Sequence, residues 1–139
     1  MLKRIVSANR VFEPGERTEY SNSNYILLGY ILEDITNKDY KSNLQERIAK
    51  PLGLLSTDYG SKVNTAANQS KSYKYEENLW VPEDETDMSI PGGAGAIVST
   101  PEELNRFIRA IFQGKVLSES SKEEMLRLKD NFGLGVVNK

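Results

Sequence analysis

The chain has 139 residues, with 18 Lys and Arg against 20 Asp and Glu, a formal net charge of -2, and neither His nor Cys. Without those two residue types it cannot by itself form a zinc site of the usual nitrogen and sulfur ligands, a Ser-His-Asp triad, a thiol nucleophile or a disulfide framework. The near-neutral charge and the lack of any run of ~18 apolar residues predict no nucleic-acid partner and no membrane span, and we expect no metal or cofactor.

The first predicted helix covers residues 25–35, where most residues are apolar. Four of them follow the i, i+3, i+4, i+7 spacing of a helical stripe, namely Leu28, Ile31, Leu32 and Ile35. We therefore expect a central helix that is buried on most sides. Residues 21–24 are Ser and Asn, which are favoured helix N-caps, and residues 37–39 are turn formers that end the helix.

A second helix is predicted at residues 40–50, where Tyr40, Leu44 and Ile48 are spaced by four on one face. Pro51 is expected to stop this helix, because proline cannot continue the backbone hydrogen-bond ladder. Gly53 then completes the exit of the chain from the helix.

The segment of residues 54–90 is polar and contains only short β-prone pieces such as residues 72–75. Its acidic residues 83–87 lack the ligand spacing and mid-loop glycine of an EF-hand, so a solvated loop is predicted there. Trp80 is expected to pack in the core or at its rim, with substrate contact as the alternative. Tyr73 and Tyr75, two residues apart, are typical of strand packing.

The last part of the chain begins with a glycine-rich turn at residues 91–96, which matches neither a P-loop nor a dinucleotide-binding fingerprint. Residues 100–103 then form a strong helix start, with an N-cap hydroxyl, a proline in the first turn and a glutamate at the capping-box position. This helix ends at Gly114 and is expected to turn four apolar side chains inward, namely Leu104, Phe107, Ile108 and Ile111. A short helix from Ser118 follows, and residues 132–137 resemble the first strand of a further element.

These elements predict a mainly α protein, or an α+β protein with minor peripheral strands, that forms one domain over residues 1–139.

Within this order of elements, residues 12–29 carry a specific pattern. A Phe-x-Pro-Gly turn at residues 12–15 precedes Tyr20-Ser21-Asn22, and then come Asn24-Tyr25 and a helix that contains Leu28-Gly29. This pattern resembles the second motif region of the serine β-lactamase and penicillin-binding-protein superfamily, in its class C-like branch.

The resemblance continues along most of the chain and in the expected order. The Pro-Leu-Gly-Leu run at residues 51–54 is similar to the family's helix exit, which a threonine follows, here Thr57. Residues 92–104 resemble its glycine-rich turn, Ser-Thr pair and helix, and residues 132–135 resemble its Phe-Gly-Leu-Gly strand. The resemblance implies the helical subdomain of a class C β-lactamase-like fold without the main antiparallel sheet, with residues 54–90 as a variable insert.

In such enzymes the resemblance implies catalytic roles for Tyr20 and Asn22. A phenol with a pKa near ~10 becomes a useful base only beside a cation, so Tyr20 would join a proton relay with lysines of the other motifs. Asn22 would hold a motif lysine and the carbonyl of the substrate amide through its two kinds of polar atom. The alternative is that Ser21 or Asn22 caps the next helix and Tyr20 packs beneath it, and capping can coexist with catalysis.

Two family motifs are absent from the sequence. No serine has a lysine three residues on, and there is no Lys-(Thr/Ser)-Gly or His-x-Gly triplet. We therefore expect a fragment of a larger serine hydrolase, of the β-lactamase or D-Ala-D-Ala carboxypeptidase type, that is inactive alone. The parent would act on a small molecule or peptide, leaving β-lactam, D-alanyl peptide and ester open, and the resemblance implies an extracytoplasmic location. Self-association through an uncovered face is expected, and the alternative is an autonomous, non-catalytic helical binding module.

Overall fold

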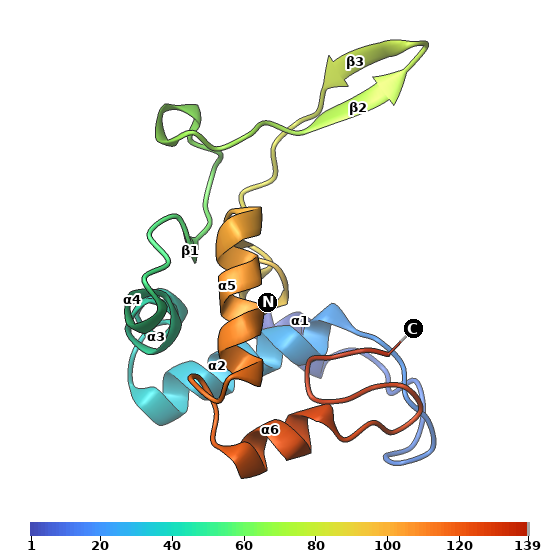
Figure 1. Cartoon of the computed structure of the whole chain (residues 1–139). Coiled ribbons are helices and arrows are strands. Elements are labelled where there is room, and N and C mark those ends of the chain that lie inside the picture. Colours follow the sequence, from blue (N-terminus) through green and yellow to red (C-terminus); the bar gives the residue numbers. More distant parts are fainter. Residues whose placement is uncertain (139) are drawn as a thin grey trace.

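The computed structural model describes residues 1–138, in which helices dominate and two small antiparallel sheets have two strands each (Figure 1). The α-helices are α1 (Leu2–Val6), α2 (Asn22–Thr36), α3 (Tyr40–Leu44), α4 (Lys50–Leu52), α5 (Pro101–Phe112) and α6 (Glu119–Leu126). The strands are β1 (Asp58–Tyr59), β2 (Tyr73–Glu76), β3 (Leu79–Pro82) and β4 (Ile97–Val98). The mainly α class predicted from the sequence is confirmed, while α1 and the β1–β4 pair had not been expected.

Helix α2 confirms the first predicted helix and its N-cap. The backbone of Ser21 is extended, and its side-chain oxygen accepts a hydrogen bond from the Ser23 amide at 3.2 Å. The helix ends where Asn37 adopts a left-handed conformation at φ 51°. The expectation of burial on most sides is wrong, because Leu28, Ile31 and Ile35 are 58%, 52% and 77% exposed. The helix packs instead on the η3 turn (Gly92–Ala94) and on α3.

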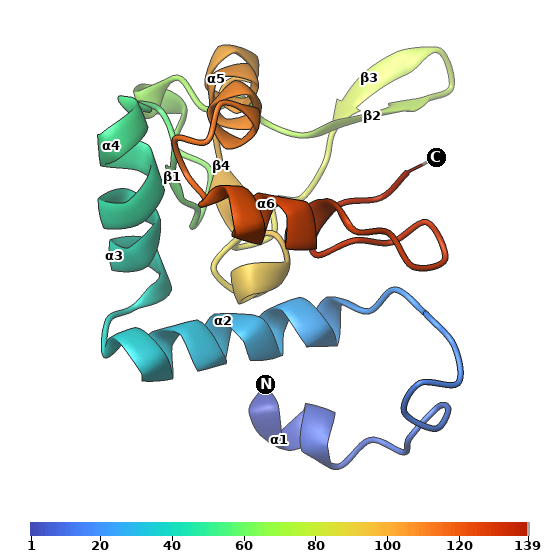
Figure 2. The ribbon, with the colours of Figure 1, turned by 60° about the horizontal axis from the view of Figure 1, so that its bottom comes forward.

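A glycine contact holds α2 against the short 3-10 turn η3 (Gly92–Ala94), which lies directly on the helix (Figure 2). Gly29, the one buried residue of α2, would place a Cβ 3.5 Å from the Gly93 amide nitrogen. A Cβ on Gly93 would collide with the carbonyl oxygen of Tyr25. The two backbones therefore approach more closely than side chains would allow.

The second predicted helix is one helical run over residues 40–52, in which a π-helical segment, η1 (Gln45–Ala49), joins α3 to α4. Pro51 does not stop the run, contrary to expectation, and the chain leaves it at Gly53, whose φ is 63°. The π segment has already departed from the i→i−4 hydrogen-bond pattern that proline would interrupt, so Pro51 is tolerated inside the last turn. The Leu54 amide closes this end by donating to the Ala49 carbonyl at 2.8 Å.

The core lies between this helical run, residues 54–60 and α5. Its buried apolar residues are Leu44, Ala49, Leu54, Ala96 and Ala110. Helix α5 begins as predicted, with the Thr100 hydroxyl accepting from the Glu103 amide at 3.3 Å. The expected inward face is wrong in part, because Leu104 and Ile108 are 50% and 53% exposed. The helix is turned instead so that Glu103 and Ala110 are buried.

Glu103 binds the loop before β1 rather than closing a capping box with Thr100. Its carboxylate accepts from the Ser56 amide at 2.9 and 3.1 Å and from the Thr57 hydroxyl at 2.6 Å. The Thr57 oxygen is also 2.7 Å from the Ser99 hydroxyl, which donates to it. These bonds, led by that from Thr57, hold the pKa of the Glu103 carboxyl below its usual range. The carboxylate thus ties α5 to Thr57, which lies 46 residues earlier in the chain.

Strands β2 and β3 form a hairpin that projects from the body of the molecule (Figure 1). Its two-residue turn, Glu77-Asn78, has φ values of 47° and 65°, which is the geometry of a type I′ turn. Tyr75 faces Trp80 across the strands, with ring centroids 5.1 Å apart. The expected packing of Trp80 at the core is wrong, because this side chain is 70% exposed and stacks within the hairpin.

The end of the described chain folds back on itself after α6. Residues 129–137 form two isolated bridges, Lys129 with Phe132 and Phe132 with Val137, so the strand predicted at residues 132–137 is not formed. A strand needs a neighbouring strand for its hydrogen bonds, and here the segment pairs with its own residues. Its start lies near the second motif region, where the Thr18 hydroxyl donates to the Asp130 carboxylate at 3.5 Å.

No helix within residues 1–138 is both long and apolar enough to cross a membrane.

Candidate active site

The Tyr20-Ser21-Asn22 motif lies at the N-terminus of α2, where Tyr20 precedes the helix, Ser21 is its N-cap and Asn22 is its first residue. The Tyr20 hydroxyl donates to the Asn22 side-chain oxygen at 2.9 Å, and both side chains are exposed. Because Ser21 uses its own oxygen to cap the helix, it does not compete for either group. The cap fixes the direction in which the two predicted site residues leave the backbone, so the structure brings Tyr20 and Asn22 together.

The packing around the motif separates the two interpretations of it. Ser21 caps α2 as the structural interpretation predicts, but Tyr20 does not pack beneath the helix, because its side chain is 65% exposed. The ring of Tyr20 lies beside that of Tyr25, with centroids 6.0 Å apart and planes at 40°. An exposed hydroxyl with a fixed direction is available to a second molecule or segment.

In the part of the chain that the structure describes, no charged side chain bonds to Tyr20 or Asn22. There, neither side chain forms an ion pair, and the one side-chain hydrogen bond of the pair is the bond between Tyr20 and Asn22. A phenol acts as a base near neutral pH when a cation stabilises the phenolate. The pair can therefore orient a proton and a carbonyl, and it needs a cation from elsewhere to move that proton.

A small polar cavity of about 100 Å³ lies further along α2, between the helix, Tyr40, Tyr59 and the η3 turn. Glu33 accepts from the Tyr40 amide at 2.8 Å, and the Tyr59 hydroxyl donates to the Ser89 carbonyl at 3.2 Å. Burial raises the pKa of both tyrosines, whose rings are 5.6 Å apart. No sequence signal marks this cavity, because its residues come from four separate segments and form no motif.

The comparison with families of known proteins covers almost the whole chain. The family model described as "Beta-lactamase" matches residues 1–135. Among curated relatives, the D-alanyl-D-alanine-carboxypeptidase/endopeptidase AmpH of Escherichia coli (strain K12) is 25% identical over 125 residues, which are 90% of this chain and 31% of AmpH. The chain spans 27% to 31% of the length of the curated relatives that it matches over most of its own length.

Solved structures give the same result in three dimensions. A D-stereospecific amidohydrolase from Streptomyces is 32% identical, with a TM-score of 0.76, over 89% of this chain and 40% of that one. A penicillin binding protein from Bacillus halodurans is 20% identical, with a TM-score of 0.77, over 96% of this chain and 44% of that one. The second likeness shows the fold alone.

Proposed function

Because this chain belongs to the β-lactamase family, we propose that it is the helical part of a serine hydrolase that cleaves amide or ester bonds through an acyl-serine intermediate. The observation that carries the proposal is the hydrogen bond of 2.9 Å between the Tyr20 hydroxyl and the Asn22 side chain. It lies at the capped N-terminus of α2, at the position where the family resemblance expects a site. The chain forms one helical subdomain in this proposal, with residues 54–90 as its variable insert.

The two residues have different tasks in the proposed reaction. Serine attack on a carbonyl needs a group that takes the serine proton and returns it to the leaving group, and the Tyr20 hydroxyl has that role. The Asn22 oxygen accepts from Tyr20 and has a second lone pair for a lysine, while its amide NH₂ donates to the substrate carbonyl. The nucleophilic serine and the lysines come from segments outside this chain, since the sequence holds no Ser-x-x-Lys and no Lys-(Thr/Ser)-Gly.

The substrate class that we propose is an amide or peptide with a D-configured residue beside the scissile bond. Its support is that two similar proteins are described as a D-stereospecific amidohydrolase and a D-alanyl-D-alanine-carboxypeptidase/endopeptidase. Both descriptions concern those proteins, and their chemistry is carried over here as a proposal. We also propose, from the family resemblance, that the intact enzyme acts outside the cytoplasm, in the periplasm, the envelope or the medium.

Exposed apolar side chains on α2 and α5 further support self-association of this chain when it is alone. Those on the outer face of α2 are Leu28, Ile31 and Ile35, and those on α5 are Leu104, Ile108 and Phe112. Apolar surface of this kind is normally covered by a neighbouring element or by a second molecule.

Labelling with a fluorescent penicillin tests the proposal on two proteins. The chain of residues 1–139 is expected to give no covalent adduct, whereas a longer product of the same reading frame is expected to be acylated at a serine outside residues 1–139. A stoichiometric mass shift on the short chain would overturn the assignment of the nucleophile. A reading frame without a Ser-x-x-Lys before residue 1 would overturn the proposed enzyme and favour a binding module.

A further inference from the structure

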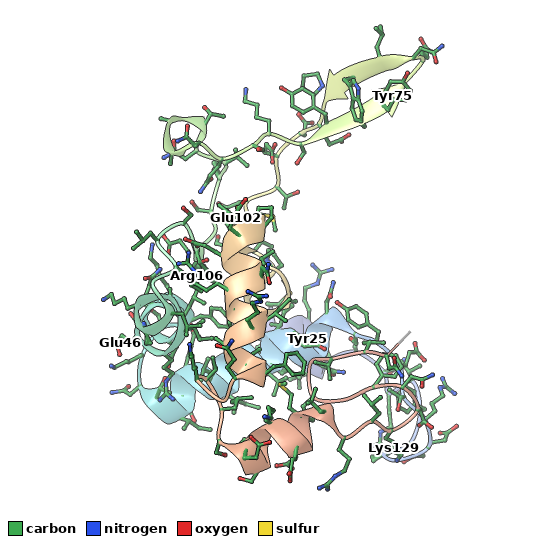
Figure 3. The ribbon with its side chains drawn as sticks, viewed as in Figure 1. Tyr25, Glu46, Tyr75, Glu102, Arg106 and Lys129 are labelled. Atoms are coloured by element: carbon green, nitrogen blue, oxygen red, sulfur yellow. The ribbon has the colours of Figure 1, made fainter. Side chains whose placement is uncertain are left out.

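A groove of about 460 Å³ lies between α4 and α5 and is separate from the Tyr20 region. Figure 3 shows Glu102 at the start of α5, Arg106 on one side of this helix and Tyr25, near the motif, on the other. The volume is within the range of roughly 300–1,000 Å³ that is typical of small-molecule sites. Leu52 and the buried Ala110 contribute apolar surface to its lining.

The charges around this groove are unbalanced. Arg106, Arg109 and Lys115 line it, and Glu102 is the only carboxylate among its lining residues. The groove is therefore locally positive by two charges, three cations against one carboxylate, in a chain whose net charge is -2. Across residues 1–138 the ion pairs lie elsewhere, so none of the three cations is neutralised by a carboxylate within 4.0 Å.

A bond to the backbone holds the Arg106 guanidinium in place, and a turn fixes the backbone that carries Lys115. Arg106 donates from one guanidinium nitrogen to the Gly53 carbonyl at 2.8 Å, which leaves its other donors free. The Lys115 amide donates to the Ala110 carbonyl at 2.9 Å, in the turn that Gly114 makes at φ 69°. Arg109 follows Arg106 by three residues, so both guanidinium groups lie on the same face of α5.

We propose that this groove binds a small molecule with a multiply charged phosphate group. Two guanidinium groups present planar, paired donors that match phosphate oxygens, and the Lys115 ammonium adds a third positive charge. The phosphate would lie towards the C-terminal end of α5, away from Glu102, which is about two turns before Arg109. The alternative is that the three cations only stabilise the carbonyl end of the helix.

Titration of the whole chain with sodium pyrophosphate at constant ionic strength, followed by NMR, tests the proposal. We expect saturable shifts of the Arg106, Arg109 and Lys115 resonances. The double variant Arg109→Gln/Lys115→Gln should weaken binding by about tenfold or more, because charge-assisted hydrogen bonds are lost. Glu102→Gln should tighten it, and Arg47→Gln, an exposed cation outside the groove, should leave it unchanged.

Two results would overturn the assignment. One is a linear, unsaturated response to pyrophosphate that is equal in the parent chain and in the double variant. The other is unchanged pyrophosphate affinity in a double variant whose melting temperature has fallen, which would assign the cations to the end of α5. Circular dichroism of each variant shows whether it is folded, and Glu102→Gln provides a second test in a variant that retains all three cations.

Discussion

At the scale of single residues, three neighbouring side chains at the N-terminus of α2 have two different roles. Ser21 satisfies an amide of the helix start, while Tyr20 and Asn22 bond to each other in the solvent. The sequence predicted the cap, because Ser and Asn before an apolar run favour one. It could not predict the bond of Tyr20 to Asn22, because both spacing and propensity leave the side-chain direction open.

Tyr20→Phe tests the proton relay. In the intact enzyme the variant should lower the rate of acylation by about a hundredfold or more, because positioned acid-base groups contribute roughly that much. The matched control is Tyr30→Phe, at an exposed tyrosine on the same helix. Equal acylation rates in the two variants would show that Tyr20 is not a catalytic group. In the short chain, the Asn22 side-chain amide resonance should move in Tyr20→Phe and not in Tyr30→Phe.

Glu103 shows how a local motif can be correct in position and wrong in partner. The sequence places it at N3 of α5, where a glutamate usually bonds back to the N-cap. The structure turns it to Ser56 and Thr57, which are 47 and 46 residues away. A local pattern carries no information on a partner so distant, and this is why the buried carboxylate was missed.

Stability should depend on pH through Glu103. The pKa of its carboxyl is lower in the folded chain than its ordinary value of 4.5, so the folded state binds fewer protons than the unfolded state. Its contribution is therefore fully present above that ordinary value and is lost as pH falls through the lower, folded pKa. Urea unfolding between about pH 6 and about pH 3 should show this fall, and Glu103→Gln should reduce it. Glu102→Gln, one residue away and exposed, should retain the whole fall; if it does not, the carboxyl is misassigned.

At the scale of elements, apolar spacing and capping residues predicted where the helices lie, but they did not predict which faces of the helices are buried. The periods of α2 and α5 were right, whereas Leu28 and Leu104 are exposed, because periodicity identifies a stripe and not what covers it. The β2–β3 hairpin has its turn at Glu77-Asn78, which lacks the glycine that usually signals a type I′ turn. The π segment before Pro51 has no sequence signature of comparable strength.

Gly93→Ala should weaken the packing of α2 on the η3 turn and so destabilise the fold. The new Cβ meets the Tyr25 carbonyl oxygen, so the η3 turn or the helix must move, at a cost of about 1–3 kcal/mol in unfolding free energy. Gly95→Ala is the control in the same region, because its Cβ would have nothing nearer than 3.9 Å. Urea denaturation of both variants measures the difference. If Gly95→Ala is as destabilising as Gly93→Ala, the close approach of the two backbones does not matter to stability.

At the scale of the whole molecule, the exposed faces of α2 and α5 should make this chain self-associate. Light scattering coupled to gel filtration should give a mass that rises with concentration, because association buries apolar surface. The double variant Leu28→Lys/Ile31→Lys should shift the chain towards a monomer. Leu55→Lys, at a leucine that is 94% exposed outside both helices, should not. A concentration-independent monomer in the parent chain would contradict this prediction.

The projecting hairpin also decides what a fluorescence experiment on this protein reports. Trp80 is the single tryptophan of the chain and lies on a hairpin that stands apart from the core. Its indole is already in contact with water in the native protein, so its emission should be red-shifted from the start and change little when the core melts. A denaturation curve monitored by tryptophan fluorescence would therefore report the contact between Tyr75 and Trp80. It would follow the opening of the β2–β3 hairpin and not the unfolding of the core.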